Sequence, residues 1–213
     1  MNYQKELDQL IEKLQASGTP KKLLIHSCCA PCSSYVLEYL SRYFEITVFY
    51  YNPNIFPAEE YHRRAEEQER LIREIPKGYP ITFLQGSYEP KEYYDTVKGL
   101  EDAGEGSQRC FRCYRLRLRE AAQIAREGGY DYFTTTLSVS PHKNAEKLNE
   151  IGRELATEYG VSYLPSDFKK RNGYRRSIEL SKEYDLYRQD YCGCVYSRRE
   201  REEMKAASDK AEM

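Results

Sequence analysis

Short apolar runs alternate with longer charged stretches along most of this chain. Five runs have the length and hydrophobicity of buried strands: residues 22–26, 45–51, 81–84, 130–137 and 161–164. The stretches between them predict amphipathic helices at residues 2–15, 57–74, 90–100, 109–127 and 144–159, and Pro31 is placed to open one more. Strands that alternate with helices are typical of the α/β class. The pattern therefore predicts a parallel sheet of about five strands with helices on both faces.

Length and composition favour one domain. The 213 residues are enough for one well-filled core, so we expect a single domain over residues 1–213. The charged tail, residues 198–213, is expected to be a solvated helix or partly disordered. The chain starts without an apolar signal core, and no apolar run approaches the ~20 residues that span a bilayer. We therefore expect a cytoplasmic protein with no membrane partner, in a compartment where thiols stay reduced.

Three segments that carry polar and sulfur side chains come directly after predicted strands. Cys28 and Cys29 follow the first strand, residues 138–143 follow the fourth, and residues 166–170 follow the fifth. In open α/β sheets, ligands bind beyond the carboxyl ends of the strands. We therefore expect these segments to share one edge of the sheet and to form the functional site there.

All seven cysteines lie in short motifs. The motifs are His26-Ser27-Cys28-Cys29-Ala30-Pro31-Cys32, Cys110-Phe111-Arg112-Cys113 and Cys192-Gly193-Cys194. A cysteine used only for packing has no reason to lie beside another, whereas clustered thiolates suit a soft metal. In a reduced compartment this pattern favours metal binding or redox catalysis over structural disulfides.

The first two motifs favour a metal centre. Cys110 and Cys113 are spaced to lie on one side of the first turn of a helix. The helix N-terminus, together with Arg109 and Arg112, is expected to lower the pKa of both thiols.

The adjacent pair Cys28 and Cys29 is expected to have diverging side chains. Such a pair fits a zinc site poorly and a multi-iron cluster better. Cys32, one turn further on, is as well suited to packing as to ligation.

The third motif has two interpretations. Gly193 permits a positive φ between Cys192 and Cys194, which lets the two sulfurs approach each other. They then form either a strained, easily reduced disulfide or two further metal ligands.

The net charge of −1 gives no overall sign of a nucleic-acid partner, so any RNA-binding surface has to be a local patch. Two basic runs qualify, one at Arg109, Arg112, Arg115 and Arg119 and one at Lys169, Lys170, Arg171, Arg175 and Arg176. Three tyrosines suited to stack on bases are interleaved near the second run: Tyr174, Tyr187 and Tyr191. From charge alone, a solvated basic face explains both runs equally well.

Further motifs accompany the cysteines. They are Tyr51-Asn52-Pro53-Asn54-Ile55 with Glu60, Tyr61 and Arg64; Arg109-Cys110-Phe111-Arg112-Cys113-Tyr114-Arg115-Leu116-Arg117-Leu118; Phe133-Thr134-Thr135-Thr136-Leu137 with Ser140, Pro141 and Lys143; Asp167-Phe168-Lys169-Lys170 with Gly173, Tyr174 and Ser177; and Leu186-Tyr187-Arg188-Gln189-Asp190-Tyr191-Cys192-Gly193-Cys194-Val195-Tyr196-Ser197. In these segments, which cover most of residues 22–197, the chain resembles the cobalamin-independent epoxyqueuosine reductases, the QueH family.

The resemblance implies a nucleotide-hydrolase-like (HUP-like) fold and reduction of the epoxide of epoxyqueuosine at the tRNA wobble position. It implies an iron–sulfur centre without cobalamin, namely a [4Fe–4S] cluster on Cys28, Cys29, Cys110 and Cys113, with Cys192 and Cys194 as a redox-active pair. The tRNA and an external electron donor are the implied partners, and an additional iron beside the cluster is left open. With the resemblance, the expected tRNA contacts are Lys169, Lys170, Arg175, Arg176 and Tyr174.

Two details bear on the chemistry. ATP-using relatives of this fold carry a glycine-rich phosphate loop after the first strand, whereas residues 27–31 here contain no glycine, so we expect a metal site in its place. The epoxide oxygen has to be protonated as it leaves, and the candidate donors are Asp167, Lys143, His142 and Tyr191. We assign Asp167 to catalysis, with metal ligation or helix capping as alternatives. His26, inside an apolar strand, is expected to be a hydrogen-bonded core residue rather than a ligand.

Two other classes of function remain open from the sequence. One is a zinc-stapled tRNA-binding module without catalysis, which predicts a colourless protein with one zinc. The other is a thiol–disulfide oxidoreductase that needs no metal, although Cys110 and Cys113 do not follow a strand in a thioredoxin-like order.

Overall fold

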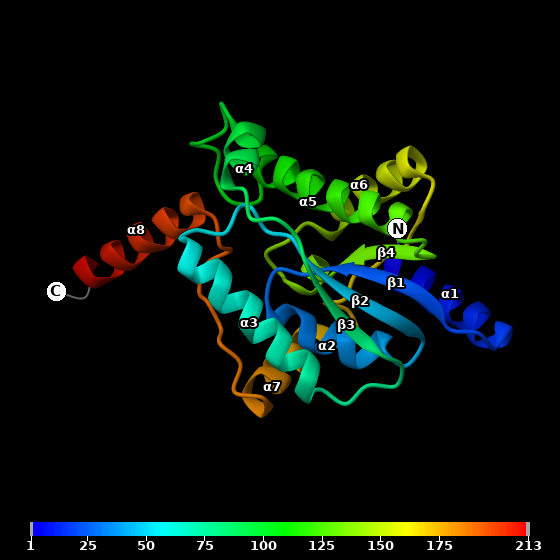
Figure 1. The fold of residues 1–213 in the computed structure, drawn as a ribbon. Helices are drawn as coiled ribbons and strands as arrows, with labels where there is room; N and C mark the ends of the chain where they lie inside the picture. The colour runs from blue at the N-terminus through cyan, green and yellow to red at the C-terminus, as the bar shows by residue number, and fades with distance from the viewer. Residues whose placement is uncertain (1, 212–213) are drawn as a thin grey trace.

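The computed structural model describes residues 2–211, and a five-stranded parallel sheet lies at its centre (Figure 1). The strands are β1 (Lys21–His26), β2 (Phe44–Tyr50), β3 (Ile81–Gln85), β4 (Tyr132–Thr135) and β5 (Ser162–Tyr163). They lie in the order β3-β2-β1-β4-β5, and every neighbouring pair is parallel. The predicted α/β class and its five-stranded sheet are confirmed.

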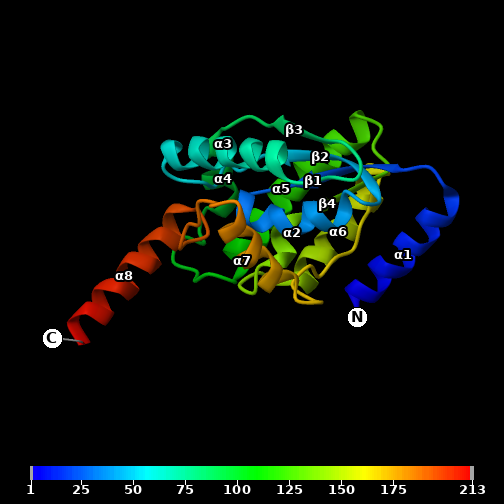
Figure 2. The same ribbon diagram turned by 90° about the horizontal axis from the view of Figure 1, so that it is seen from below.

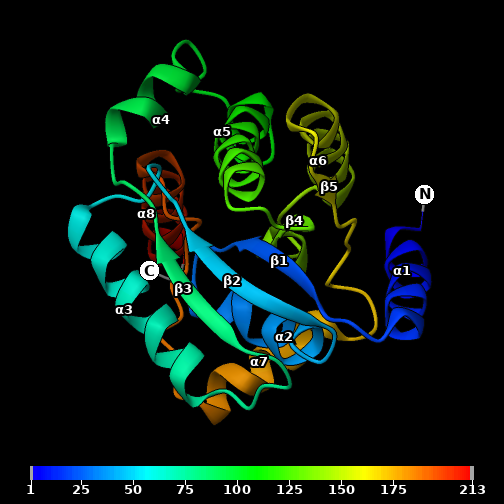
Figure 3. The same cartoon turned by 45° about the vertical axis from the view of Figure 1, so that its right-hand side comes forward.

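Helices cover both faces of the sheet (Figure 3). The helices are α1 (Tyr3–Ser17), α2 (Ala30–Leu40), α3 (Ala58–Glu74), α4 (Pro90–Val97), α5 (Gln108–Glu127), α6 (Ala145–Tyr159), α7 (Gly173–Glu183) and α8 (Val195–Ala211), with a short 3-10 helix at Thr136–Val139. Helices α2, α3 and α7 lie on one side of the sheet, and α4, α5 and α6 lie on the other. Helix α8 extends away from the sheet (Figures 1 and 2). In the described part of the chain, no helix is long and apolar enough to cross a membrane.

Strand β1 shows why the sheet needs two covered faces. Leu23 and Ile25 pack into the cluster that contains Leu37 of α2, whereas Leu24 packs into the cluster that contains Leu118 of α5. Because successive side chains of a strand point to opposite faces, a continuous apolar run is buried on both sides. This arrangement is the doubly wound one that the alternating pattern predicts.

Two local predictions differ from the structure. The fourth strand ends at Thr135 rather than residue 137, because the Thr135 side chain accepts from the Leu137 N–H and caps a 3-10 helix. Helix α7 is not among the predicted elements, since its sequence is mostly polar and charged. The tail predicted as a solvated helix or partly disordered is helical, as α8.

The topology places the first cysteine motif at a switch point. Strand β1 pairs with both β2 and β4, and the helix that follows β1 lies on the opposite face from the helix that precedes β4. His26 pairs with Thr135, so β1 and β4 end side by side. The crevice beyond such a pair of strand ends is where open α/β sheets bind their ligands.

Candidate metal centre

Three thiols meet between β1 and α2. The Sγ atoms of Cys28, Cys29 and Cys32 lie within 4.8 Å of one another, and those of Cys28 and Cys29 are 3.8 Å apart. The prediction that Cys28 and Cys29 diverge is wrong, because the chain bends at Cys28 instead of continuing as a strand. The hydrogen bond between the two thiols raises the pKa of Cys28 to about 12 and lowers the pKa of Cys29. Cys29 is therefore the thiol of this pair that ionises first.

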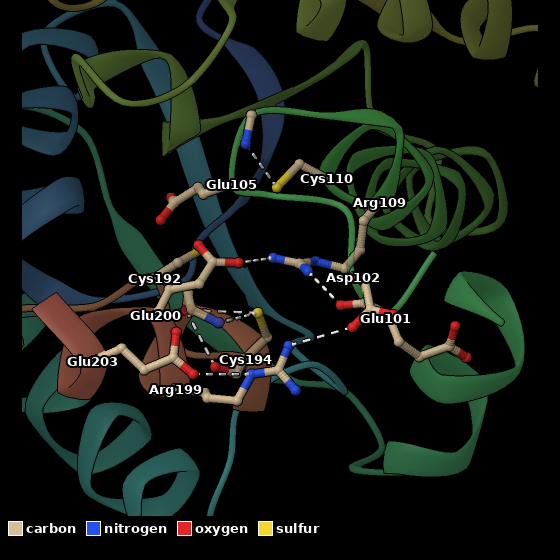
Figure 4. A network of polar contacts seen from close by, with 12 residues as sticks. Glu101, Asp102, Glu105, Arg109, Cys110, Cys192, Cys194, Arg199, Glu200 and Glu203 are labelled. Atoms are coloured by element: carbon tan, nitrogen blue, oxygen red, sulfur yellow. Dashed lines mark hydrogen bonds and ion pairs between the residues drawn. The ribbon is translucent and has the colours of Figure 1, made fainter. Parts of the chain in front are cut away.

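The other two cysteine groups come together at the start of α5 and the start of α8 (Figure 4). The backbone N–H of Gly106 donates to Cys110 Sγ at 3.3 Å. Burial raises the pKa of Cys113 to about 12, and the neighbouring charges of Cys192 and Cys194 add to the effect. Cys110, Cys192 and Cys194 are therefore close enough to Cys113 for their charges to affect its pKa.

The predicted lowering of the pKa of Cys110 and Cys113 is wrong. Burial is the largest influence on both thiols, and it raises both pKa values. The two arginines expected to favour the thiolates are engaged elsewhere. Arg109 is paired with Glu200 at 2.7 Å (Figure 4), and Arg112 donates to a backbone carbonyl of α4.

Arg117 links the first cysteine group to the others. Its side chain is 1% exposed, its Nε donates to the backbone carbonyl of Cys113 at 3.3 Å, and Nη1 donates to Asn52 Oδ1 at 3.5 Å. Burial acts to lower the pKa of Arg117, but the charges of Cys113, Cys192 and Cys28 outweigh it and raise the pKa. Arg117 is therefore a buried cation that faces all three cysteine groups.

A second buried arginine fixes the Cys192-Gly193-Cys194 segment. Arg64 is paired with Glu60 at 2.6 Å and donates from Nη1 to the Cys192 carbonyl at 3.1 Å. Gly193 has φ of 131°, and a Cβ at this position would lie 3.0 Å from Arg64 Nη1. The predicted positive φ of Gly193 is confirmed, and both backbone strain and lack of space require glycine there.

The two cysteines of this segment have different surroundings. Lys143 Nζ lies 3.1 Å from Cys192 Sγ and 2.5 Å from Glu105 Oε1. Cys194 is buried, and its Sγ accepts from the Ser197 N–H at 3.4 Å in the first turn of α8. Burial acts to lower the pKa of Lys143, but the charges of Cys192 and Glu105 raise it, so Lys143 stays protonated. Both cysteines are free thiols in this structure, and their redox pairing stays a prediction.

A cavity of about 520 Å³ opens onto the thiols. Cys28, Cys29, Cys32 and Cys192 line it, together with Arg117. Its walls come from the first turn of α2, residues 137–143, residues 188–192 and the inner side of α8. The predicted convergence at the carboxyl edge of the sheet is confirmed, and the first two of the three segments line this cavity.

The third segment reaches the same edge of the sheet: Ser166 Oγ lies 2.9 Å from Ser138 Oγ, and the Phe168 N–H donates to Ser138 Oγ at 3.3 Å. Asp167 forms an ion pair with Lys169 at 2.8 Å, and both Asp167 and Lys170 line a second cavity beside the N-terminus of α1. Asp167 does not line the thiol cavity, whereas His142, Lys143 and Tyr191 do. Position therefore favours these three over Asp167 as proton donors.

Most residues of the two basic runs form ion pairs with carboxylates. Arg175 pairs with Glu179 and Arg176 pairs with Glu38, while Arg115 in the first run pairs with Glu154. Of the five residues expected to contact tRNA, Tyr174 is the one that lines the thiol cavity.

His26 has the predicted core role. It is fully buried, its Nε2–H donates to the Tyr51 carbonyl at 3.1 Å, and its Nδ1 lies 3.0 Å from Thr135 Oγ1. Burial lowers the pKa of His26 to about 3, so the ring is neutral.

Comparison with known proteins identifies a family whose members match this chain over the segment that contains the site. The sequence profile of the family described as Epoxyqueuosine reductase QueH matches residues 23–200, a range that contains all seven cysteines. The chain belongs to this family. The resemblance seen in the motifs is thereby confirmed.

Epoxyqueuosine reductases QueH of several bacteria are similar to this chain. The epoxyqueuosine reductase QueH of Streptococcus pyogenes serotype M1 is 46% identical over 92% of this chain and 78% of the relative. The QueH of Thermotoga maritima is 39% identical over 86% of this chain and 94% of the relative. Among solved structures, a predicted subunit of tRNA methyltransferase from Methanocaldococcus jannaschii matches with a TM-score of 0.47 and 13% identity over 76% of each chain. That similarity is too low to bear on function.

Sequence reasoning missed three residues of this QueH site. Arg117 lies four residues after Cys113 on one helical face, so helical spacing was a usable signal for it. Arg64 belongs to one of the motifs that carry the resemblance, but its contact with Cys192 depends on the fold, and Glu105 carried no sequence signal because it reaches Lys143 only through the fold.

Proposed function

We propose that this chain reduces the epoxide of epoxyqueuosine in tRNA to the alkene of queuosine. The reaction consumes two electrons and two protons and releases the epoxide oxygen as water. The observation that carries the proposal is that Cys28, Cys29, Cys32 and Cys192 line one cavity with the buried Arg117, which also contacts the backbone of Cys113, in a chain of the QueH family.

The residues present fit an iron–sulfur centre. Cys28, Cys29, Cys110 and Cys113 would hold the [4Fe–4S] cluster, since thiols are its usual ligands, three of these four are buried and Cys110 is half-buried. When bound, the cluster supplies single-electron transfer and a Lewis-acidic iron. Cys32 is close enough to Cys28 and Cys29 to be an alternative ligand, or to hold an additional iron.

Cys192 and Cys194 match the electron count of the reaction. Oxidation of two thiols to one disulfide releases two electrons and two protons, which is what the epoxide consumes. An external electron donor then returns the pair to the dithiol. Lys143 is placed to act as a proton donor in the reduction of the epoxide, because its protonated Nζ lies 3.1 Å from Cys192 Sγ at the wall of the cavity.

The tRNA would enter from the side of the cavity that α8 borders. Tyr174 is placed to stack on a splayed base, and Arg188 and Arg201 line the same wall. Lys169, Lys170, Arg175 and Arg176 remain proposed contacts to the tRNA backbone, farther from the thiols.

The proposal is tested by nucleoside analysis of tRNA that contains epoxyqueuosine. The anaerobically reconstituted protein is incubated with this tRNA and a reductant, and the digested nucleosides are separated. We expect queuosine to replace epoxyqueuosine, and we expect Cys113→Ser to abolish the conversion. An epoxide that persists in the presence of an intact cluster would refute the function.

A further inference from the structure

Three arginines of the described chain are almost fully buried, and they differ in their partners. Arg64 pairs with Glu60 at 2.6 Å, and Arg109 pairs with Glu200 at 2.7 Å. Arg117 is 1% exposed, yet no carboxylate among residues 2–211 lies within ion-pair distance of it. Its hydrogen bonds go to a backbone carbonyl and an amide oxygen, both uncharged.

A buried charge without a counter-ion is unstable, because the guanidinium loses its hydration and gains no opposite charge in return. Arg117 lines the thiol cavity together with Cys28, Cys29, Cys32 and Cys192, and its Nε donates to the backbone carbonyl of Cys113. The groups around the Arg117 side chain are therefore sulfur atoms and uncharged oxygens, and an anionic centre bound at these sulfurs would supply the counter-ion that the described side chains do not.

We propose that Arg117 is the built-in counter-ion of the sulfur centre, and that it positions the centre and sets its reduction potential. The inference rests on the cofactor in the proposed function. A [4Fe–4S] core held by four thiolates carries net negative charge in every common oxidation state, and reduction adds one more negative charge. A fixed guanidinium beside it stabilises the reduced form more than the oxidised form.

Two effects of opposite sign follow. Without the cluster, replacing Arg117 by an apolar residue of similar length removes an unpaired buried charge, so the apo protein gains stability or keeps it. With the cluster, the same change leaves the anionic centre without its counter-ion, so the cluster is lost faster and its midpoint potential falls. A residue that only fills space would destabilise both forms.

The test compares Arg117→Met and Arg117→Lys with the wild type, and it uses Arg119→Met, an exposed arginine on the same helix, as a matched control. Three quantities are measured: the unfolding midpoint of the apo chain, the rate of iron loss to a chelator, and the midpoint potential of the cluster by spectroscopic titration. For Arg117→Met we expect an unchanged or higher apo midpoint, at least tenfold faster iron loss, and a potential at least 59 mV more negative, a tenfold change in a one-electron equilibrium. Arg117→Lys should lie near the wild type in potential, and Arg119→Met should match it throughout.

Wild-type iron loss and potential in Arg117→Met would overturn the inference while leaving the proposed function intact. If tRNA binding alone then falls, Arg117 contacts a substrate phosphate instead. A wild-type chain that takes up no cluster would overturn both the inference and the cofactor assignment.

Discussion

Lys143 is the side chain on which the proton chemistry depends most directly. It is buried between Glu105 and Cys192 and lines the cavity, whereas Asp167 lies at a different cavity. Because general acids contribute roughly 10²–10⁴-fold, Lys143→Met should slow single-turnover epoxide reduction by about 10²-fold or more, with cluster content unchanged. Lys143→Arg should recover part of the rate, and Asp167→Asn should keep it. A Lys143→Met enzyme of normal rate beside an inactive Asp167→Asn enzyme would reverse these roles.

His26 couples the stability of the apo protein to pH. Burial holds the pKa of His26 at about 3 in the folded chain, against 6.5 for an exposed histidine. As the pH falls below about 6.5, His26 becomes protonated in the unfolded chain but stays neutral in the folded chain. The contribution of neutral His26 to the free energy of unfolding is therefore fully present above pH 6.5 and is lost as the pH falls toward 3. Between pH 7 and pH 5 the expected loss is ~2 kcal/mol, measured by urea unfolding. His26→Gln should remove this loss, and a change at the exposed His62 should not; equal pH dependence in His26→Gln would rule out the coupling.

Individual side chains were predictable from sequence where a motif carries them. The clustered cysteines and Gly193 could be read directly, since their spacing and chemistry are local. The direction of the pKa shifts at Cys110 and Cys113 could not, because burial depends on contacts far along the chain. The same holds for Glu105, which meets Lys143 only in the folded protein.

Among the secondary-structure elements, those with a strong apolar period were predicted well. Strands β1 to β3 and helices α3, α5 and α6 match their expected ranges to within a few residues. The end of β4 and the helix α7 were missed because side-chain capping at Thr135 and tertiary contact with α2, rather than periodicity, determine them.

Helix α8 lines the cavity through Ser197, Glu200, Arg201 and Met204, so its charges should affect tRNA binding. Arg188 and Arg201 line the cavity, and Arg201 pairs with Asp190 at 3.3 Å. Lys169 pairs with Asp167 at 2.8 Å, and Lys170 lies at the second cavity. Each lost phosphate contact lowers the slope of log affinity against log salt by about 0.7–0.9. We expect Arg188→Ala with Arg201→Ala to lower that slope more than Lys169→Ala with Lys170→Ala, and both pairs to weaken binding. Unchanged binding of both double variants at two salt concentrations would contradict this surface.

The complete site exists only when the chain is folded from end to end. Its thiols come from residues 28–32, from residues 110–113 and from residues 192–194, which the sheet and helices α2, α5 and α8 bring together. Sequence order placed two of these groups beside strand or helix ends, and the parallel topology predicted a common edge. Arg117 and Arg64 donate hydrogen bonds to the backbone of Cys113 and Cys192, and these contacts depend on packing that the sequence pattern does not reveal.

The central claim is that these thiols hold an iron–sulfur centre. The most direct test is anaerobic purification followed by iron, zinc and sulfide analysis with an absorption spectrum. We expect a brown protein with about four irons and matching sulfide per chain, and iron in excess of sulfide if an additional iron is bound. A colourless protein with one zinc, even after reconstitution with iron and sulfide, would contradict the account and favour a structural zinc module.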